Sequence, residues 1–258
     1  MSRNPWLIAG RGGHPAALRL FCFPYAGGSA SVFHSWRAAL APDIDVIAVQ
    51  MPGRAERLLE EMPTRIEPLV EALAEAIVPC AGRRFAFFGH SLGGLVAFEL
   101  ARVLQRRGAA QPERVIVSGC DAPRHRKAER ALHRLDDAAF VEVLRDYKGT
   151  PPEILANREL MRLLLPAVRA DFEISESYVP LHDAPLDRPL TVLAGVHDER
   201  DSDAAVEGWA QETRAGCDVH WFDGDHFFIN PHREAVLDCL RRTLAPRAVR
   251  DVPNALSA

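Results

Sequence analysis

A single serine carries the strongest chemical signal in the sequence. Ser91 is the central residue of Gly89-His90-Ser91-Leu92-Gly93, which lies between the apolar run 85–88 and a helical pattern over 95–106. A serine on a sharp strand-to-helix turn presents its hydroxyl above the edge of a sheet, and the flanking glycines permit that turn. A serine hydroxyl is a weak nucleophile unless a neighbouring base accepts its proton. The pattern therefore predicts the nucleophile of an acyl hydrolase.

The best candidate for the base is a histidine near the carboxyl end of the chain. His226 follows the last expected strand, 218–222, and precedes a closing helix expected over 231–244. A loop at the carboxyl end of a late parallel strand reaches the edge where the serine turn emerges. His90 is adjacent to the serine, but in such a turn its side chain points away from the hydroxyl. His197 is a weaker second candidate.

An acid is needed to orient the imidazole of this base. Asp198 follows the expected strand 190–194, and the order Ser, Asp, His is the one that this kind of site uses. Its carboxylate would accept the Nδ1–H of His226 and stabilise the imidazolium. Two alternatives remain: Asp201 lies in the same loop, and Asp121 directly follows another expected strand.

Backbone donors for a developing oxyanion are expected from two places. The loop 23–28, with sequence Phe-Pro-Tyr-Ala-Gly-Gly, follows the first clear strand, and its glycines permit close approach to a ligand. We assign the donors to the N–H groups of Ala26 and Leu92, with Tyr25 as the alternative to Ala26. The competing interpretation of the loop is a simple tight turn.

The elements that must position these residues follow an alternating pattern. Short apolar runs alternate with longer helical patterns, which is typical of a mostly parallel sheet flanked by helices. This predicts an α/β fold of the α/β-hydrolase kind in a single domain over 1–258. The expected strands are 18–23, 45–49, 85–88, 114–118, 190–194 and 218–222.

One long stretch departs from this alternation. Residues 122–187 contain helical patterns, such as 136–147 and 158–172, and no clear strand. Long insertions in compact domains are usually functional, so we expect a helical lid over the active site. The alternative is two ordinary crossover helices. The tail 246–258 is expected to be frayed.

Composition limits the classes of partner and of cofactor. The chain has 258 residues, of which 48% are hydrophobic, and a net charge of −4, which argues against a nucleic-acid surface. Its five cysteines are widely spaced and indicate neither disulfides nor a zinc site. Such cysteines are expected in a protein of the reducing cytoplasm. No apolar run has the length of a membrane span. We expect a cytoplasmic monomer that needs no metal or organic cofactor.

The same motifs carry a family resemblance that spans almost the whole chain. The chain resembles the type II thioesterases that accompany polyketide synthases and non-ribosomal peptide synthetases. The Pro52-Gly53-Arg54 motif, together with the loop 23–28, is more specific to this family than the serine pentapeptide is. The matching segments are Leu20–Ser29, Gln50–Arg57, Phe88–Gly94, Gly195–Asp198 and Gly224–Phe228.

The resemblance implies a substrate that the residues alone do not. Members of this family hydrolyse acyl groups from the phosphopantetheine arm of acyl or peptidyl carrier proteins, which removes stalled or aberrant chains; small acyl thioesters are further substrates. Family members often have proline after the acid, whereas Glu199-Arg200-Asp201 follows here, which keeps Asp201 open. The alternative function is a general serine carboxylesterase or lipase-like hydrolase. The family's functional positions fall on Ser91, Asp198, His226, Ala26 and Leu92.

Two groups of basic residues lie outside the serine, histidine and acid motifs. The segment 123–134 is strongly basic, and we expect it near the entrance for the phosphate-bearing arm, with a solvated helix face as the alternative. Arg54 and Arg57 follow Pro52-Gly53 at a strand end, where we favour a structural role in ion pairs over a role in anchoring loops near the pocket.

Overall fold

The centre of the molecule is a seven-stranded sheet. The computed structural model describes residues 4–9, 18–81, 84–126, 131–199 and 202–245. The strand order is β1-β3-β2-β4-β5-β6-β7, and every neighbouring pair is parallel except β1 with β3. The strands are β1 (Leu7–Ile8), β2 (Leu18–Phe23), β3 (Ile44–Val49), β4 (Phe85–His90), β5 (Val115–Ser118), β6 (Leu190–Gly195) and β7 (Cys217–Phe222).

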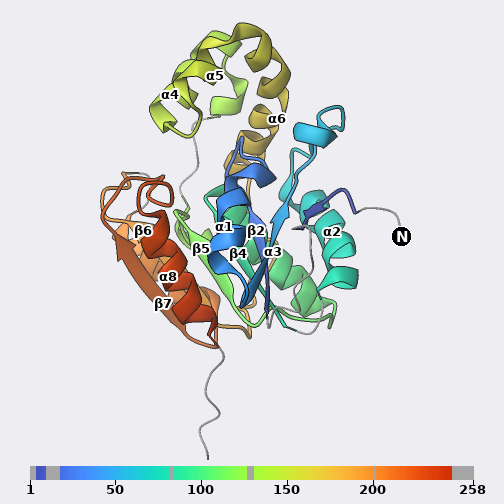
Figure 1. Ribbon diagram of the computed structural model, residues 1–258, viewed down its shortest axis with the longest axis vertical. Coiled ribbons are helices and arrows are strands. Elements are labelled where there is room, and N and C mark those ends of the chain that lie inside the picture. The colour runs from blue at the N-terminus through green and yellow to red at the C-terminus, as the bar shows by residue number, and fades with distance from the viewer. Residues whose placement is uncertain (1–3, 10–17, 82–83, 127–130, 200–201, 246–258) are drawn as a thin grey trace, which may run out of the picture.

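Helices cover both faces of this sheet (Figure 1). Residues of α2 and α3 belong to the core on one face, and residues of α1 and α8 belong to the core on the other. The flanking helices are α1 (His34–Leu40), α2 (Ile66–Ile77), α3 (Leu92–Arg106), α7 (Asp203–Glu207) and α8 (Arg233–Leu244). Short 3₁₀ helices are Ala30–Phe33, Ala55–Arg57, Val78–Cys80, Pro123–His125, Leu132–Arg134 and Gly208–Glu212.

The central strand β4 shows why both faces must be covered. All six of its residues are buried. Phe85 and Phe87 pack into the core under α2 and α3, whereas Ala86 and Phe88 pack into the core under α1 and α8. Successive side chains of a strand point to opposite faces, so an uninterrupted apolar run requires a layer of helices on each side. This run therefore fixes β4, and the turn after it, at the middle of the sheet.

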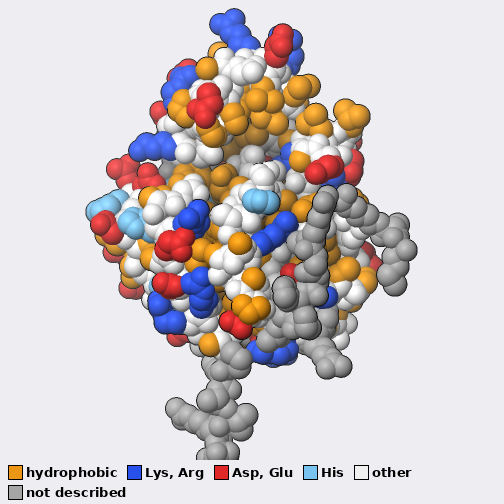
Figure 2. Space-filling view, viewed as in Figure 1, with side chains coloured by type: hydrophobic (Ala, Val, Ile, Leu, Met, Phe, Trp, Pro, Cys, Tyr) orange, Lys and Arg blue, Asp and Glu red, His pale blue; other side chains and the backbone are white. Residues whose placement is uncertain are grey.

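A group of helices between β5 and β6 projects from one end of the molecule (Figure 1). It consists of α4 (Asp137–Tyr147), α5 (Pro152–Ala156) and α6 (Arg158–Glu176). These helices share a small core of their own, which includes Phe140, Leu165 and Phe172. Figure 2 shows hydrophobic side chains on the surface of this end of the molecule. It also shows a hollow between these helices and the part of the molecule that contains the sheet. We call α4–α6 the helical segment.

The helices of this segment begin at side chains that cap them. The Asp136 carboxylate accepts the N–H of Ala139 at 2.9 Å, and the Asn157 side chain accepts the N–H of Leu160 at 3.1 Å. Aspartate and asparagine at this position satisfy backbone donors that the first turn of a helix leaves unpaired. Asp136 therefore caps α4, and Asn157 caps α6.

The fold class predicted from the sequence, an α/β fold of the hydrolase kind, is confirmed. The six expected strands are present, but the antiparallel β1 was not predicted, because two residues are too few to show an alternating pattern. Helix α3 begins at Leu92 rather than at residue 95, and α6 continues to Glu176 beyond the expected end at 172. The expected tail 246–258 lies outside the described residues. Within the described part of the chain, no helix is long and apolar enough to cross a membrane.

Candidate active site

Ser91 lies on a strained turn between β4 and α3. Its φ of 53° and ψ of −122° fall in a region that residues with a side chain rarely adopt. Its N–H donates to the carbonyl of Ser118 at the end of the neighbouring β5, at 2.7 Å. Strained backbone of this kind persists where the surrounding structure fixes it, and it clusters at functional sites. The turn therefore projects the Ser91 side chain beyond the carboxyl edge of the sheet.

Both glycines of the pentapeptide are required by close backbone contacts. A Cβ at Gly89 would lie 1.9 Å from the carbonyl oxygen of Gly93, so only glycine fits there. A Cβ at Gly93 would lie 2.2 Å from the carbonyl oxygen of Phe23. The first contact closes the turn on itself, and the second presses it against the loop that follows β2. The serine turn and the predicted oxyanion loop are therefore in direct contact.

His226 and Asp198 form a buried hydrogen-bonded pair. Nδ1 of His226 lies 2.6 Å from Oδ2 of Asp198, and their side chains are 5% and 0% exposed. Asp198 lies just after β6, where its own N–H donates to the carbonyl of Gly195. His226 lies in the loop after β7. A carboxylate on Nδ1 fixes the imidazole so that Nε2 is the nitrogen available to accept a proton.

The alternatives for these two positions lie elsewhere. His197 is exposed, and its Nε2 lies 3.0 Å from Oδ1 of Asp223 at the surface. Asp121 lies after β5 and lines the pocket described below, whereas Asp198 is the carboxylate that accepts the Nδ1–H of His226. Asp201 lies outside the described residues. The geometry supports Asp198 as the acid.

His90 packs directly behind His226. The two ring centroids are 5.2 Å apart, and Nδ1 of His90 lies 2.9 Å from the hydroxyl oxygen of Ser118. Burial lowers the pKa of His90 well below its usual value, and the nearby His226 lowers it further. His90 is therefore neutral beside His226. The sequence reasoning treated His90 only as a side chain pointing away from the serine and missed this contact.

The loop after β2 is a tight turn at the pocket. The N–H of Gly28 donates to the carbonyl of Tyr25 at 2.8 Å, and the φ of Gly27 is 76°. A positive φ at the third position of a four-residue turn is typical of type II turns and favours glycine. Ala26 occupies the second position. Leu92 is the first residue of α3, where the helix itself provides no carbonyl for the N–H.

One pocket collects the predicted residues with the exception of Asp198, which lies behind His226. Ala26, Ser91, Leu92 and His226 all line it. The helical segment contributes further wall residues, Ser175 among them, and those with apolar or aromatic side chains come from α4 and α6. These are Leu144, Tyr147 and Phe172. The candidate nucleophile, the candidate base and two candidate N–H donors thus line one cavity with a partly apolar wall.

The basic segment predicted near the entrance is divided in the structure. Arg124 forms an ion pair with Glu212 and donates to the carbonyl of Asp183. Arg126 lines the pocket, where its guanidinium donates to the side chain and carbonyl of Ser175. Residues 127–130 lie outside the described residues. Within the described part of the segment, Arg126 is the cationic side chain at the pocket.

Comparison with known proteins identifies the family. The model of the thioesterase domain family matches residues 18–244. The chain belongs to the thioesterase family. This thioesterase is 38% identical to the gramicidin S biosynthesis protein GrsT of Aneurinibacillus migulanus, over 95% of this chain and 97% of the relative.

Solved structures agree with this assignment. The type II thioesterase BorB from the borrelidin biosynthetic cluster superposes with a TM-score of 0.86 at 35% identity, covering 92% of this chain and 97% of that one. The RedJ thioesterase from the prodiginine pathway of Streptomyces coelicolor gives a TM-score of 0.83 at 38% identity, covering 89% and 91%. The family expected from the sequence motifs is confirmed, and the chain is a serine thioesterase of the type II kind rather than a general carboxylesterase.

Proposed function

We propose that this thioesterase hydrolyses acyl thioesters on the phosphopantetheine arm of acyl or peptidyl carrier proteins, through an acyl-enzyme on Ser91. The observation that carries the proposal is the His226–Asp198 hydrogen bond of 2.6 Å beside a pocket that Ser91 also lines. An editing role, the removal of stalled or aberrant chains, follows from the pathways in which GrsT and BorB are named.

In the first half-reaction, the Ser91 oxygen attacks the thioester carbonyl carbon while Nε2 of His226 accepts the hydroxyl proton. The N–H groups of Ala26 and Leu92 donate to the oxyanion that forms. The carbon–sulfur bond then breaks, and the leaving thiol takes the proton from His226. Asp198 keeps the imidazole oriented and stabilises its charged form.

In the second half-reaction, a water molecule attacks the ester carbonyl of the acyl-enzyme. His226 accepts a proton from this water, and the same two N–H groups stabilise the second oxyanion. The carbon–oxygen bond to Ser91 breaks, and Ser91 recovers its proton from His226. The products are the free acid and the unchanged enzyme.

The two ends of the substrate would meet different parts of the pocket. Leu144, Tyr147 and Phe172 offer an apolar wall for the acyl chain. Arg126 offers a cation for the phosphate of the arm, because guanidinium groups match phosphate oxygens with paired donors. The helical segment acts in this proposal as the lid that separates the acyl chain from water. Carrier-protein substrates fit a cytoplasmic enzyme, as does the wide spacing of the five cysteines, which indicates no disulfide framework.

The test compares one acyl group on three leaving groups. Rates are measured with the acyl group on a carrier-protein arm, on N-acetylcysteamine, and as an ethyl ester, with Ser91→Ala as the control for background hydrolysis. We expect the highest kcat/KM for the carrier thioester and the lowest for the oxygen ester. A kcat/KM for the ester equal to or above that for the carrier thioester would refute the proposal.

A further inference from the structure

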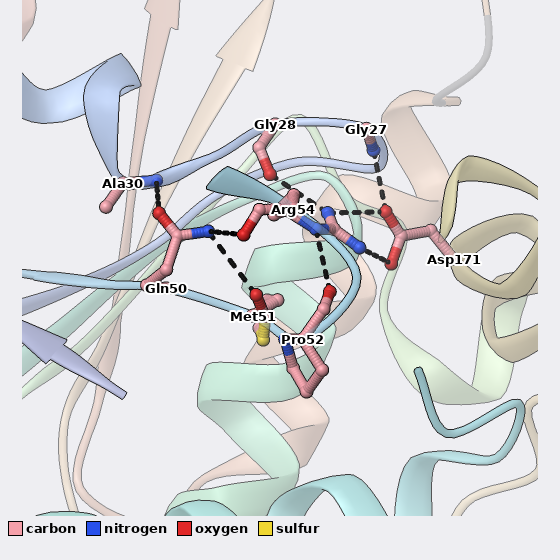
Figure 3. Close-up of polar contacts among 8 residues, drawn as sticks. All are labelled: Gly27, Gly28, Ala30, Gln50, Met51, Pro52, Arg54 and Asp171. Carbon is pink, nitrogen blue, oxygen red and sulfur yellow. Dashed lines mark hydrogen bonds and ion pairs between the residues drawn. The ribbon is translucent and has the colours of Figure 1, made fainter. Parts of the chain in front are cut away.

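A buried ion pair connects the helical segment to the loop at the active site (Figure 3). Nη1 and Nη2 of Arg54 donate to the two carboxylate oxygens of Asp171 at 2.8 and 2.9 Å, across 117 residues of sequence. Arg54 is 5% exposed and Asp171 is 1% exposed. Arg54 follows β3, and Asp171 lies on α6. The planar guanidinium matches a carboxylate with two parallel hydrogen bonds, which gives the pair a defined geometry.

Both partners also bind the turn that contains Ala26. Oδ2 of Asp171 accepts the N–H of Gly27 at 2.7 Å. Nη1 of Arg54 donates to the carbonyl of Gly28 at 2.9 Å. Figure 3 shows Gly27 and Gly28 side by side above the guanidinium and the carboxylate. The pair therefore holds the peptide group between Ala26 and Gly27 and the one between Gly28 and Ser29.

These contacts determine where the N–H of Ala26 points. That N–H lies in the same peptide plane as the carbonyl of Tyr25. The Tyr25 carbonyl accepts the N–H of Gly28 at 2.8 Å, and Arg54 holds Gly28 through its carbonyl. On the other side of Ala26, Asp171 holds the next peptide plane through the N–H of Gly27. Both peptide planes that flank Ala26 are thus oriented through the ion pair.

Close packing leaves this arrangement little freedom. A Cβ at Gly27 would lie 3.4 Å from a methyl group of Val168, and a Cβ at Gly53 would lie 2.8 Å from the Cβ of Ala167. Both contacts come from the turn of α6 before Asp171. The same helix contributes Phe172 to the pocket wall. One helix therefore touches the acyl pocket and orients the loop.

We propose that Arg54 and Asp171 are positioning residues that orient the Ala26 N–H for the oxyanion, so that the position of α6 is coupled to catalytic competence. Neither belongs to the pocket lining, so both act through the turn. This inference rests on the assignment of Ala26 as an oxyanion donor in the proposed function. It also limits the lid motion, because displacing α6 at Asp171 would release the turn.

Stability alone is a weak reason for this ion pair. Replacing a buried ion pair by apolar side chains of similar volume is often neutral or stabilising, because both charges must be desolvated. Removing one partner alone leaves an unpaired buried charge. A double replacement of Arg54 and Asp171 therefore separates the effect on folding from the effect on the turn.

The primary test is the Asp171→Asn variant with a carrier thioester. The amide group puts a donor where a carboxylate oxygen accepted, so the variant loses either the contact from Nη2 of Arg54 or both the contact from Nη1 and that from the N–H of Gly27. We expect kcat to fall on the order of 10²-fold while KM changes by less than about 3-fold, because an oxyanion donor acts in the transition state. A kcat within about 3-fold of the wild-type value in a folded Asp171→Asn variant would refute the inference.

Arg57 provides the matched control for a buried arginine. It is 6% exposed, pairs with Glu60 and donates to the carbonyl of Gln50. Among the described residues, these side-chain hydrogen bonds of Arg57 do not include the turn that contains Ala26. Arg57→Lys and Arg54→Lys make the same chemical change three residues apart. We expect the 10²-fold fall in kcat only for Arg54→Lys. Equal falls in kcat for both variants would assign the effect to general stability.

Two further measurements remove the dependence on folding and on deacylation. The Arg54→Leu/Asp171→Leu double variant should unfold at a temperature near that of the wild type yet keep the low kcat, and recovery of kcat would refute the inference.

An acyl trifluoromethyl ketone forms a hemiketal with Ser91, and the weaker oxyanion site of Asp171→Asn should raise the pKa of that adduct by about 1–2. An unchanged adduct pKa refutes the positioning role, whereas failure of the wild type to form the adduct refutes the proposed function.

Discussion

The carboxyl edge of the sheet and the helical segment contribute to the same pocket in different ways. Ser91 is fixed by the strained turn between β4 and α3, and Asp198 follows another fully buried strand, β6. Leu144, Tyr147 and Phe172 come from helices that pack around a separate, smaller core. The proposed nucleophile and acid therefore follow fully buried strands, whereas the wall for the acyl chain comes from an appended part.

This difference suggests how one chemistry serves different acyl chains. Side chains of the helical segment can change without moving the strand ends, so selectivity can vary while the reacting groups stay in place. The exception is Asp171, which lies on α6 but holds the turn that contains Ala26. The helical segment thus has a core of its own but also packs against the sheet through α6, whose Ala170 and Ile174 belong to the core under α2 and α3.

The largest effect is expected at the acid. Asp198→Asn should lower kcat on the order of 10⁴-fold, because the amide would hold the imidazole in the wrong tautomer. Asp121→Asn is the matched control, since Asp121 also follows a strand and lines the same pocket. We expect it to keep kcat within about 10-fold. Steady-state kinetics with one carrier thioester measure both variants, and a larger loss in Asp121→Asn would move the acid to Asp121.

A smaller effect, on selectivity, is expected in the helical segment. Tyr147→Ala enlarges the pocket wall, so kcat/KM for longer acyl chains should rise relative to shorter ones by about 10-fold or more. The control is Tyr178→Phe, because the Tyr178 hydroxyl donates to Glu99 at 2.5 Å and is absent from the pocket lining. Unchanged selectivity in Tyr147→Ala would contradict the assignment of this wall to the acyl chain.

An effect limited to carrier-bound substrates is expected at Arg126. Arg126→Glu places a negative charge beside the expected path of the arm, and KM should rise about 5–10-fold for carrier thioesters. KM for N-acetylcysteamine thioesters, which lack the phosphate, should stay the same. Arg124→Glu controls for net charge, because Arg124 is already paired with Glu212. A similar rise in KM for both substrate classes would contradict the phosphate contact.

The smallest effect concerns the buried His90. Its pKa is low in the folded state and about 6.5 in the unfolded chain, so below pH 6.5 the unfolded state binds more protons. The free energy of unfolding therefore falls on acidification, with His90 contributing up to about 1.4 kcal/mol per pH unit. His90→Gln should remove this part of the slope. Urea unfolding between pH 5 and 7.5 measures both slopes, and identical slopes would contradict a neutral His90.

The sequence carries strong local signals for the strands of the sheet and weak signals for side-chain contacts between elements that are distant in sequence. Ser91 and Asp198 each follow a recognisable apolar strand, His226 follows the half-exposed strand β7, and parallel strands bring such loop residues to one edge. Their meeting could therefore be predicted. The strand β1 could not, since two residues show no periodicity.

The Arg54–Asp171 pair had no sequence signal of its own. We favoured a structural ion pair for Arg54, but its partner is 117 residues away, inside an amphipathic helix where a single aspartate resembles a solvated residue. The contact exists because α6 crosses the loops after β2 and β3. Only the tertiary arrangement reveals it.

The most direct test of the central claim is the detection of an acyl-enzyme. The enzyme is mixed with an acyl-carrier thioester, quenched within milliseconds to seconds, digested and analysed by mass spectrometry, with Ser91→Ala treated in the same way. We predict that the acyl mass appears on the peptide containing Ser91, together with a burst of carrier thiol before steady-state acid release when deacylation is the slower step. Hydrolysis at the wild-type rate by Ser91→Ala, or an acyl group on any other residue, would contradict the account.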